Sequence, residues 1–234
     1  MRFKESVAVL TGAGGGIGRA AAVGLAREGA SLALLGRTLE PLEATRRDCE
    51  AARAGALVAP LDVRDETALA GAFDRAAREM GPVNVAVACH GVNELRRIEE
   101  MDLRTWEDVV SVNLGGVFLF VREAVRSMRA AGDGRIVIVS SVSGRPGYRK
   151  FPGFGAYAAS KYGLAGLLEV LALELRGTAI RASMICPAGV DTELFRRTFP
   201  GAAAPVAVER IVAAVLDMSD PRTAPPSGTV LDLV

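Results

Sequence analysis

The chain contains few of the side chains from which metal sites and disulfide frameworks are built. Its 234 residues include one histidine and three cysteines. Cys49, Cys89 and Cys186 are odd in number and widely spaced, which fits reduced thiols in a cytosol better than a disulfide framework or a zinc site. One histidine is a poor supply of nitrogen ligands for a catalytic metal. We therefore expect no metal site.

An excess of charge of one sign and long hydrophobic runs are also missing. Lys and Arg total 28 against 27 for Asp and Glu, and no basic run stands out. This balance argues against binding to nucleic acid or to an anionic membrane. The apolar stretch in the opening MRFKESVAVL is too short for a signal peptide, and no run reaches the roughly 18 apolar residues of a membrane span. We expect a soluble, cytoplasmic protein with no nucleic-acid or membrane partner.

The chain does contain a regular alternation of apolar and helix-forming segments. Half of its residues are hydrophobic, enough for one full core. Strand-like runs lie at residues 7–10, 31–35, 56–59, 83–88, 135–140, 180–185 and 229–233, and helical patterns fill most intervals. Runs such as SLALL and RIVIVS are typical of strands covered on both faces. The sequence predicts one α/β domain over residues 1–234, a doubly wound parallel sheet of about seven strands with helices on both faces.

The first strand-like run leads into a glycine-rich turn, TGAGGGIG, and then into an alanine-rich helical stretch. In Rossmann-type sheets this order of strand, turn and helix binds the pyrophosphate of a dinucleotide. Gly12 suits the tight turn, Gly16 lets the backbone approach the phosphates, and Gly18 lets the helix pack closely on its strand. The phosphate would lie at the positive end of the helix. A purely structural loop is the alternative.

The segment Tyr-Ala-Ala-Ser-Lys at residues 157–161 is unusual in a chain with three tyrosines and three lysines. Chance would produce this Tyr/Lys spacing only about 0.04 times. A helix that begins near Gly155 would hold Tyr157 and Lys161 one turn apart on one face. A cation roughly 4 to 5 Å away would lower the pKa of the phenol by about 2 to 3, which suits proton exchange near neutral pH. The alternative is a surface pair on an amphipathic helix.

Together these segments resemble the classical branch of the short-chain dehydrogenase/reductase family over nearly the whole chain. The family's glycine motif corresponds to Thr11–Gly18 and its Tyr-x-x-x-Lys motif to residues 157–161, while SVNLGGVF, IVIVSSVSG and CPAGVDT match its other segments in order. The resemblance implies a nicotinamide-dependent oxidoreductase that interconverts a carbonyl and a secondary alcohol, with Tyr157 as general acid/base. It implies a catalytic tetrad of Asn113, Ser141, Tyr157 and Lys161.

The resemblance also implies roles and cofactor contacts. Ser141 would orient the substrate oxygen and Lys161 would hold the nicotinamide ribose. Asn113 would hold a water, satisfy buried backbone, or do both. The expected cofactor-binding residues are Gly12, Gly16, Ile17, Gly18, Arg37, Asp62, Val63, Gly91, Tyr157, Lys161, Pro187, Val190 and Thr192. Asp62 has a second interpretation, as the cap of the helix that follows it.

The end of the second strand-like run favours NADP(H) over NAD(H). An NAD site has an acidic residue about 20 positions past the glycines, which binds the ribose 2′-hydroxyl. This chain has Gly36-Arg37 there, and an arginine can pair with the 2′-phosphate of NADP. Gly14 and Gly15 lack the basic residue that NADP-preferring relatives often carry inside the turn. A solvated Arg37 is therefore the alternative.

Two segments depart from the family pattern. Residues 88–91 read Ala-Cys-His-Gly where the family usually has Asn-Asn-Ala-Gly, so the hydrogen bonds of two asparagines are missing. We interpret His90 as a structural imidazole that partly replaces them, with cofactor contact or titration as alternatives. The loop at 142–156 is longer than usual, and Arg145, Arg149 and Lys150 in it are either solvated or recognise an acidic or carrier-bound substrate.

Several assignments stay open at this level. A 3-oxoacyl-carrier-protein reductase-like enzyme is an alternative to an enzyme of free ketones, and a non-catalytic dinucleotide-binding redox sensor is an alternative to an enzyme. The helical segments at 102–130 and 155–176 are expected to form the interface of a homodimer or homotetramer, as in related enzymes. LAGLLEVLAL is apolar around most of its circumference, more than one sheet face can bury. The alternative is that elements of the same subunit cover both faces.

Overall fold

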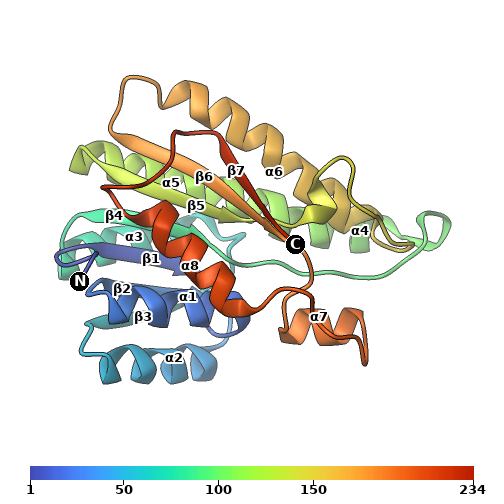
Figure 1. Cartoon of the computed structure of the whole chain (residues 1–234), viewed down its shortest axis with the longest axis horizontal. Helices are drawn as coiled ribbons and strands as arrows, with labels where there is room; N and C mark the ends of the chain where they lie inside the picture. The colour runs from blue at the N-terminus through green and yellow to red at the C-terminus, as the bar shows by residue number, and fades with distance from the viewer.

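The computed structural model describes residues 1–234 and contains one sheet of seven parallel strands in the order β3-β2-β1-β4-β5-β6-β7 (Figure 1). The strands are β1 Val7–Thr11, β2 Ser31–Gly36, β3 Ala56–Pro60, β4 Val83–Ala88, β5 Gly134–Val139, β6 Ile180–Pro187 and β7 Thr229–Leu233. All seven strands expected from the sequence are confirmed, and so is the doubly wound parallel sheet. Apolar residues along each strand face alternate sides, so every central strand contributes to two cores.

Helices cover both faces of the sheet (Figure 1). On one face lie α1 Gly16–Arg27, α2 Leu39–Ala51 and α8 Val208–Ser219, and on the other lie α3 Glu66–Met80, α5 Gly116–Ala131 and α6 Gly155–Glu174. Of the two shorter helices, α4 Leu103–Val110 packs against α6, whereas α7 Glu193–Thr198 stands apart from these layers (Figure 1). No helix has the length and apolar character that crossing a membrane requires.

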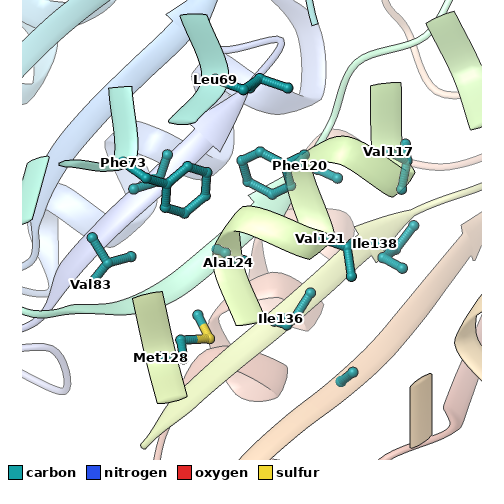
Figure 2. Packing of buried hydrophobic residues seen from close by; sticks show 14 of the residues in the cluster. Leu69, Phe73, Val83, Val117, Phe120, Val121, Ala124, Met128, Ile136 and Ile138 are labelled. Carbon is teal, nitrogen blue, oxygen red and sulfur yellow. The ribbon is translucent and has the colours of Figure 1, made fainter. Parts of the chain in front are cut away.

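The larger core lies between the sheet and the helices α3, α5 and α6 (Figure 2). The rings of Phe73 in α3 and Phe120 in α5 are 5.3 Å apart at 56°, and Ile136 and Ile138 of β5 pack beneath α5. All four side chains are buried. Burial of each is worth about 1.5–3 kcal/mol. This packing holds α5 firmly against the sheet, next to the segment that carries Asn113.

The helix expected over residues 102–130 is divided in the structure. Between α4 and α5, residues Ser111–Gly115 form a π-helical turn, and Asn113 is fully buried in it. A π turn inserts one extra residue into the helical repeat, which hydrophobic periodicity does not reveal. The Asn113 side chain bonds the loop that follows β4, at the carboxyl end of that strand.

The chain order creates an opening at those carboxyl ends. β1 pairs with β2 on one side and with β4 on the other, and the chain leaves β1 and β4 toward opposite faces. Connections that diverge in this way leave a crevice in which doubly wound sheets bind their ligands. The candidate site residues lie around this crevice.

Candidate active site

The glycine turn between β1 and α1 forms a cradle made mainly of backbone, because Gly12, Gly14, Gly15 and Gly16 carry no side chain. Gly12 and Gly16 have φ of 65° and 50°, in the left-handed region that glycine adopts without strain. A Cβ on Gly18 would lie 2.2 Å from the carbonyl oxygen of Gly12, so only glycine lets α1 start this close to β1. No side chain caps α1, and its first turn has no acidic residue. The N–H groups at this helix start are therefore available to an anion such as a pyrophosphate.

A cleft of about 410 Å³ runs from this turn across the ends of β2 and β3. All of the expected cofactor-binding residues line it except Gly18, Pro187 and Val190. Gly18 lies behind the turn, and the other two line the neighbouring cavity described below. The residues that the sequence assigned to a dinucleotide are thus gathered around one continuous surface.

Arg37 and Asp62, which are expected at the adenosine end of the cofactor, differ in whether they have a partner within the protein. Arg37 is exposed and makes no hydrogen bond or ion pair in the structure. Asp62 is bound by Arg64, whose guanidinium lies 2.6 Å from it and holds the pKa of the carboxyl below its usual range. The alternative interpretation of Asp62 as a helix cap is wrong, because Asp65 accepts the hydrogen bond from Ala68 N–H at the start of α3.

Asn113 uses its amide to hold neighbouring backbone. Its Oδ1 accepts from Val92 N–H at 2.8 Å, and its Nδ2 donates to Val92 O at 2.9 Å and to Ser160 Oγ at 3.1 Å. The expectation that it satisfies buried backbone is met. These bonds fix the loop after β4 to the helix that carries Tyr157.

Lys161 is a buried cation at the floor of the cleft. Only 3% of the residue is exposed, and its Nζ donates to Val139 O at 3.4 Å. Burial lowers the pKa of this ammonium group to about 8. The Nζ lies 5.7 Å from the centre of the Tyr157 ring, over its face, so the pair does meet on one side of α6, as the spacing predicted.

The pKa of Tyr157 differs from the expectation. Burial raises it above its usual value, a hydrogen bond with Ser141 acts in the opposite direction, and Lys161 does not lower it. The prediction of a phenol with a lowered pKa is therefore wrong for the chain by itself. The physical reason is burial, because removal from water penalises the charged phenolate. The resting side chain is a neutral phenol that can donate a proton.

His90 is a structural imidazole, as the first of its three interpretations held. Its Nδ1 lies 2.7 Å from Thr11 Oγ1 and its Nε2 lies 3.2 Å from Val112 O. Because a carbonyl can only accept, Nε2 carries the proton and Nδ1 accepts from the threonine hydroxyl. Burial lowers the pKa of His90 to about 3, so the ring is neutral at physiological pH. It joins the end of β1 to the π turn.

A second cavity, of about 450 Å³, adjoins the cleft, and Tyr157 lines both. Hydrophobic residues make up 13 of the 23 that line it. Four phenylalanines form a connected wall, Phe151 and Phe154 from the loop before α6 and Phe195 and Phe199 from α7 and its end. Sequence reasoning missed this wall. The Phe-x-x-Phe and Phe-x-x-x-Phe spacings hint at two local pairs but not at their meeting.

The basic residues of the 142–156 loop are mostly engaged within the protein. Arg145 forms an ion pair with Asp232 at 3.1 Å. Lys150 donates to three backbone carbonyl oxygens. Arg149 is exposed, with its guanidinium 5.2 Å from the centre of the Phe151 ring. Arg149, which lines the second cavity, is therefore the one cation of this loop without an ion pair or a hydrogen bond.

No group of three His, Cys, Asp or Glu side chains lies close enough together to hold a metal ion. The three cysteines are free, and burial raises the pKa of Cys89 to about 12.

Comparison with known proteins gives consistent matches. A family model described as short chain dehydrogenase matches residues 6–202. A 3β-hydroxysteroid dehydrogenase of Mediterraneibacter gnavus is 37% identical over 198 residues, covering 84% of this chain and 70% of that protein. The glycine betaine reductase ATRR of Emericella nidulans is 36% identical over 214 residues, which span 92% of this chain but only 17% of that longer protein.

Solved structures share the fold throughout. Carveol dehydrogenase from Mycobacterium avium, solved in complex with NAD, superposes with a TM-score of 0.89 at 28% identity. The superposition covers 99% of this chain and 96% of the other. The arrangement of sheet, crevice and flanking helices is therefore shared with an enzyme whose dinucleotide has been observed.

Proposed function

The chain belongs to the short-chain dehydrogenase/reductase family, whose members are oxidoreductases of CH–OH and C=O groups, and we propose that it reduces a ketone, or oxidises the matching secondary alcohol, with Tyr157 as proton donor and acceptor. One observation carries the proposal: Tyr157 lies where the cleft of the glycine turn meets the apolar cavity. A substrate in the cavity would place its oxygen at this phenol while its carbon faces the cleft.

The cleft fits a nicotinamide dinucleotide, which supplies or accepts the hydride when bound. The glycine cradle and the uncapped start of α1 suit the pyrophosphate. Thr192 lies against the turn, because a Cβ on Gly16 would be 3.1 Å from its methyl group. The free guanidinium of Arg37 suits a 2′-phosphate, so we propose a preference for NADP(H) even though carveol dehydrogenase was solved with NAD.

The protein's own groups divide the proton chemistry. Tyr157 is a neutral phenol at neutral pH, because burial raises its pKa, and it donates a proton to the carbonyl oxygen in the reducing direction. Ser141 can share a hydrogen bond with the same oxygen and hold it in place. Lys161 is a buried ammonium group with a pKa of about 8 at the floor of the cleft, where it would hold the nicotinamide ribose.

The experiment is a pair of matched substitutions on one helix. Purified protein and the variants Tyr157→Phe and Tyr162→Phe are assayed for NADPH oxidation with a panel of aldehydes, ketones and quinones. Tyr157→Phe should lower turnover at least about 10²-fold, as expected for loss of a general acid. Tyr162 is 40% exposed and does not line the cleft or the cavity, so its variant should match the parent. Equal activity of all three proteins would refute the role of Tyr157, and cofactor binding without any turnover would favour a redox sensor.

A further inference from the structure

The amide of Asn93 lies in the apolar cavity without a protein partner. The residue is 9% exposed and lines the cavity together with Ser141 and Tyr157. Its Oδ1 is buried and accepts no hydrogen bond from the protein. A buried carbonyl oxygen without a donor is costly, by an amount comparable to a lost hydrogen bond. The amide nitrogen makes no hydrogen bond either, so the side chain can turn and present its oxygen to a ligand in the cavity.

The position of Asn93 is set by the neighbouring backbone. Both polar groups of Val92 are bound by the Asn113 amide, the N–H at 2.8 Å and the carbonyl at 2.9 Å. Asn93, the next residue along the chain, therefore extends from a backbone that is held in place. Because the chain is held next to Asn93, little backbone entropy is lost when its side chain binds a ligand.

The wall beside Asn93 is aromatic and continuous. The ring centres of Phe151 and Phe199 are 5.1 Å apart, and those of Phe154 and Phe199 are 5.8 Å apart. Phe154 then meets Tyr157 edge to face, at 5.7 Å and 86°. Two segments distant in the sequence thus form one apolar surface that leads to the phenol. Such a surface best buries a flat or ring-shaped hydrocarbon.

The charges around the cavity do not suit an acidic substrate. Asp232 neutralises Arg145, and Lys150 is occupied by backbone carbonyls. Arg149 lines the cavity, but it is exposed to solvent and lies beside Phe151. An acidic or carrier-bound substrate would find one exposed cation and an apolar interior, where an unpaired carboxylate is strongly disfavoured.

From these contacts we propose the substrate class: an uncharged ring ketone or ring alcohol that carries a second hydroxyl group, with the hydrocarbon ring against the phenylalanine wall and the second hydroxyl donating to Asn93 Oδ1. This inference rests on the proposed function, since it places the reacting carbonyl at Tyr157. It makes Asn93 a specificity-determining residue, because an acceptor that is satisfied only by the hydroxylated substrate penalises an analogue without the hydroxyl.

The test uses pairs of ring ketones that differ in one group. Hydroxycyclohexanones and hydroxydecalones, with the hydroxyl at each ring position, are each compared with the methyl and the methoxy analogue. The hydroxyl member of at least one pair should show a kcat/KM about 10- to 100-fold above both analogues. The methoxy compound separates donation to Asn93 from a general preference for oxygen, because an ether can only accept.

Two asparagine variants identify the residue responsible. Asn93→Leu should remove the preference for the hydroxyl member, so that the ratio of the two kcat/KM values falls about 10-fold or more. Asn84→Leu is the matched control: the Asn84 amide accepts from Val7 N–H at the far end of the sheet, and its loss should leave the ratio as in the parent. Thermal unfolding of both variants shows that they are folded.

The outcomes separate this inference from the function on which it rests. If ketones are reduced through Tyr157 but hydroxyl and methyl members react equally in every pair, or if Asn93→Leu keeps the preference, the inference is overturned and the function stands. If carboxylated or carrier-bound ketones are preferred, and Arg149→Ala removes that preference, the proposed class is also overturned. If Tyr157→Phe reacts like the parent, the proposed function itself fails.

Discussion

At the scale of single residues, His90 shows how one side chain can replace the hydrogen bonds of another type. It spans from Thr11 at the end of β1 to Val112 O in the π turn, so one ring joins two segments of the crevice. These hydrogen bonds require a neutral imidazole ring. A protonated ring would direct a second N–H donor at the Thr11 hydroxyl, which already accepts from Cys89 N–H. Acid should therefore weaken this connection.

The pH dependence has a definite sign. The unfolded histidine titrates near 6.5 and the folded one near 3, so between these values the unfolded state binds one more proton. The free energy of unfolding should then fall as the pH falls through this window, by about 1.4 kcal/mol per pH unit from this residue. Urea unfolding of the parent and of His90→Asn from pH 7 to pH 4 measures the difference, and parallel curves would contradict it.

Arg37 carries the prediction on cofactor choice. NADPH should bind about tenfold or more tightly than NADH, because a charge-assisted bond to the 2′-phosphate is worth roughly 1.5–3 kcal/mol. Arg37→Ala should abolish the difference, and Gly36→Asp combined with Arg37→Ala should reverse it. Fluorescence titration of both cofactors measures the affinities. Tighter NADH binding by the parent would show that Arg37 contacts solvent and not the cofactor.

That reversal needs its own control. A Cβ at position 36 would lie 3.3 Å from Leu42 Cδ2, so a larger residue there must displace that side chain slightly. Gly36→Ala combined with Arg37→Ala introduces the same crowding without the new carboxylate. If the preference between NADPH and NADH reverses only in the variant with aspartate at position 36, the new negative charge is the cause.

At the scale of elements, the π turn and α5 meet in two adjacent glycines with opposite surroundings. A Cβ on Gly116 would lie 2.6 Å from Val63 Cγ2 and 3.1 Å from His90 Nε2, whereas a Cβ on Gly115 would meet nothing within 4 Å. Both glycines have right-handed helical φ and ψ. Backbone conformation is therefore the same for both, and only packing distinguishes them.

This pair predicts two substitutions of opposite sign. Gly116→Ala should destabilise the protein by about 1–3 kcal/mol, as overpacking against a stiff valine requires. Gly115→Ala should stabilise it by about 0.4–1 kcal/mol, because alanine loses less conformational freedom in a helix. Denaturant unfolding compares the two, and a stable Gly116→Ala protein would mean that the π turn shifts to make room.

At the scale of the whole molecule, apolar side chains remain exposed on the helices expected at a subunit interface. Trp106 of α4, Phe118 of α5, and Tyr162, Val170 and Leu173 of α6 are each at least 37% exposed. A Cβ on Gly166, also on α6, would meet no atom. The subunit's own elements thus leave this surface uncovered, which supports the proposal of a homodimer or homotetramer.

Light scattering tests that proposal. The purified protein should have a mass of at least twice the 24.4 kDa of one chain. Val170→Asp combined with Leu173→Asp should shift it toward the monomer, because charges are depleted at interface cores. Leu39→Asp, a similarly exposed leucine on α2, should leave the mass unchanged. A parent protein that is monomeric at micromolar concentration would rule the interface out.

The sequence by itself determined the order of strands and helices, the glycine cradle and the meeting of Tyr157 with Lys161. Each follows from residues close together in the chain, where periodicity and spacing decide which face a side chain occupies. The remaining features needed the tertiary structure. The raised pKa of Tyr157 comes from burial by distant segments. The partners of His90 lie 79 and 22 positions away. The phenylalanine wall and Asn93 come together only when the loop after β4, the loop before α6 and helix α7 meet around one cavity, and no local pattern records contacts of that range.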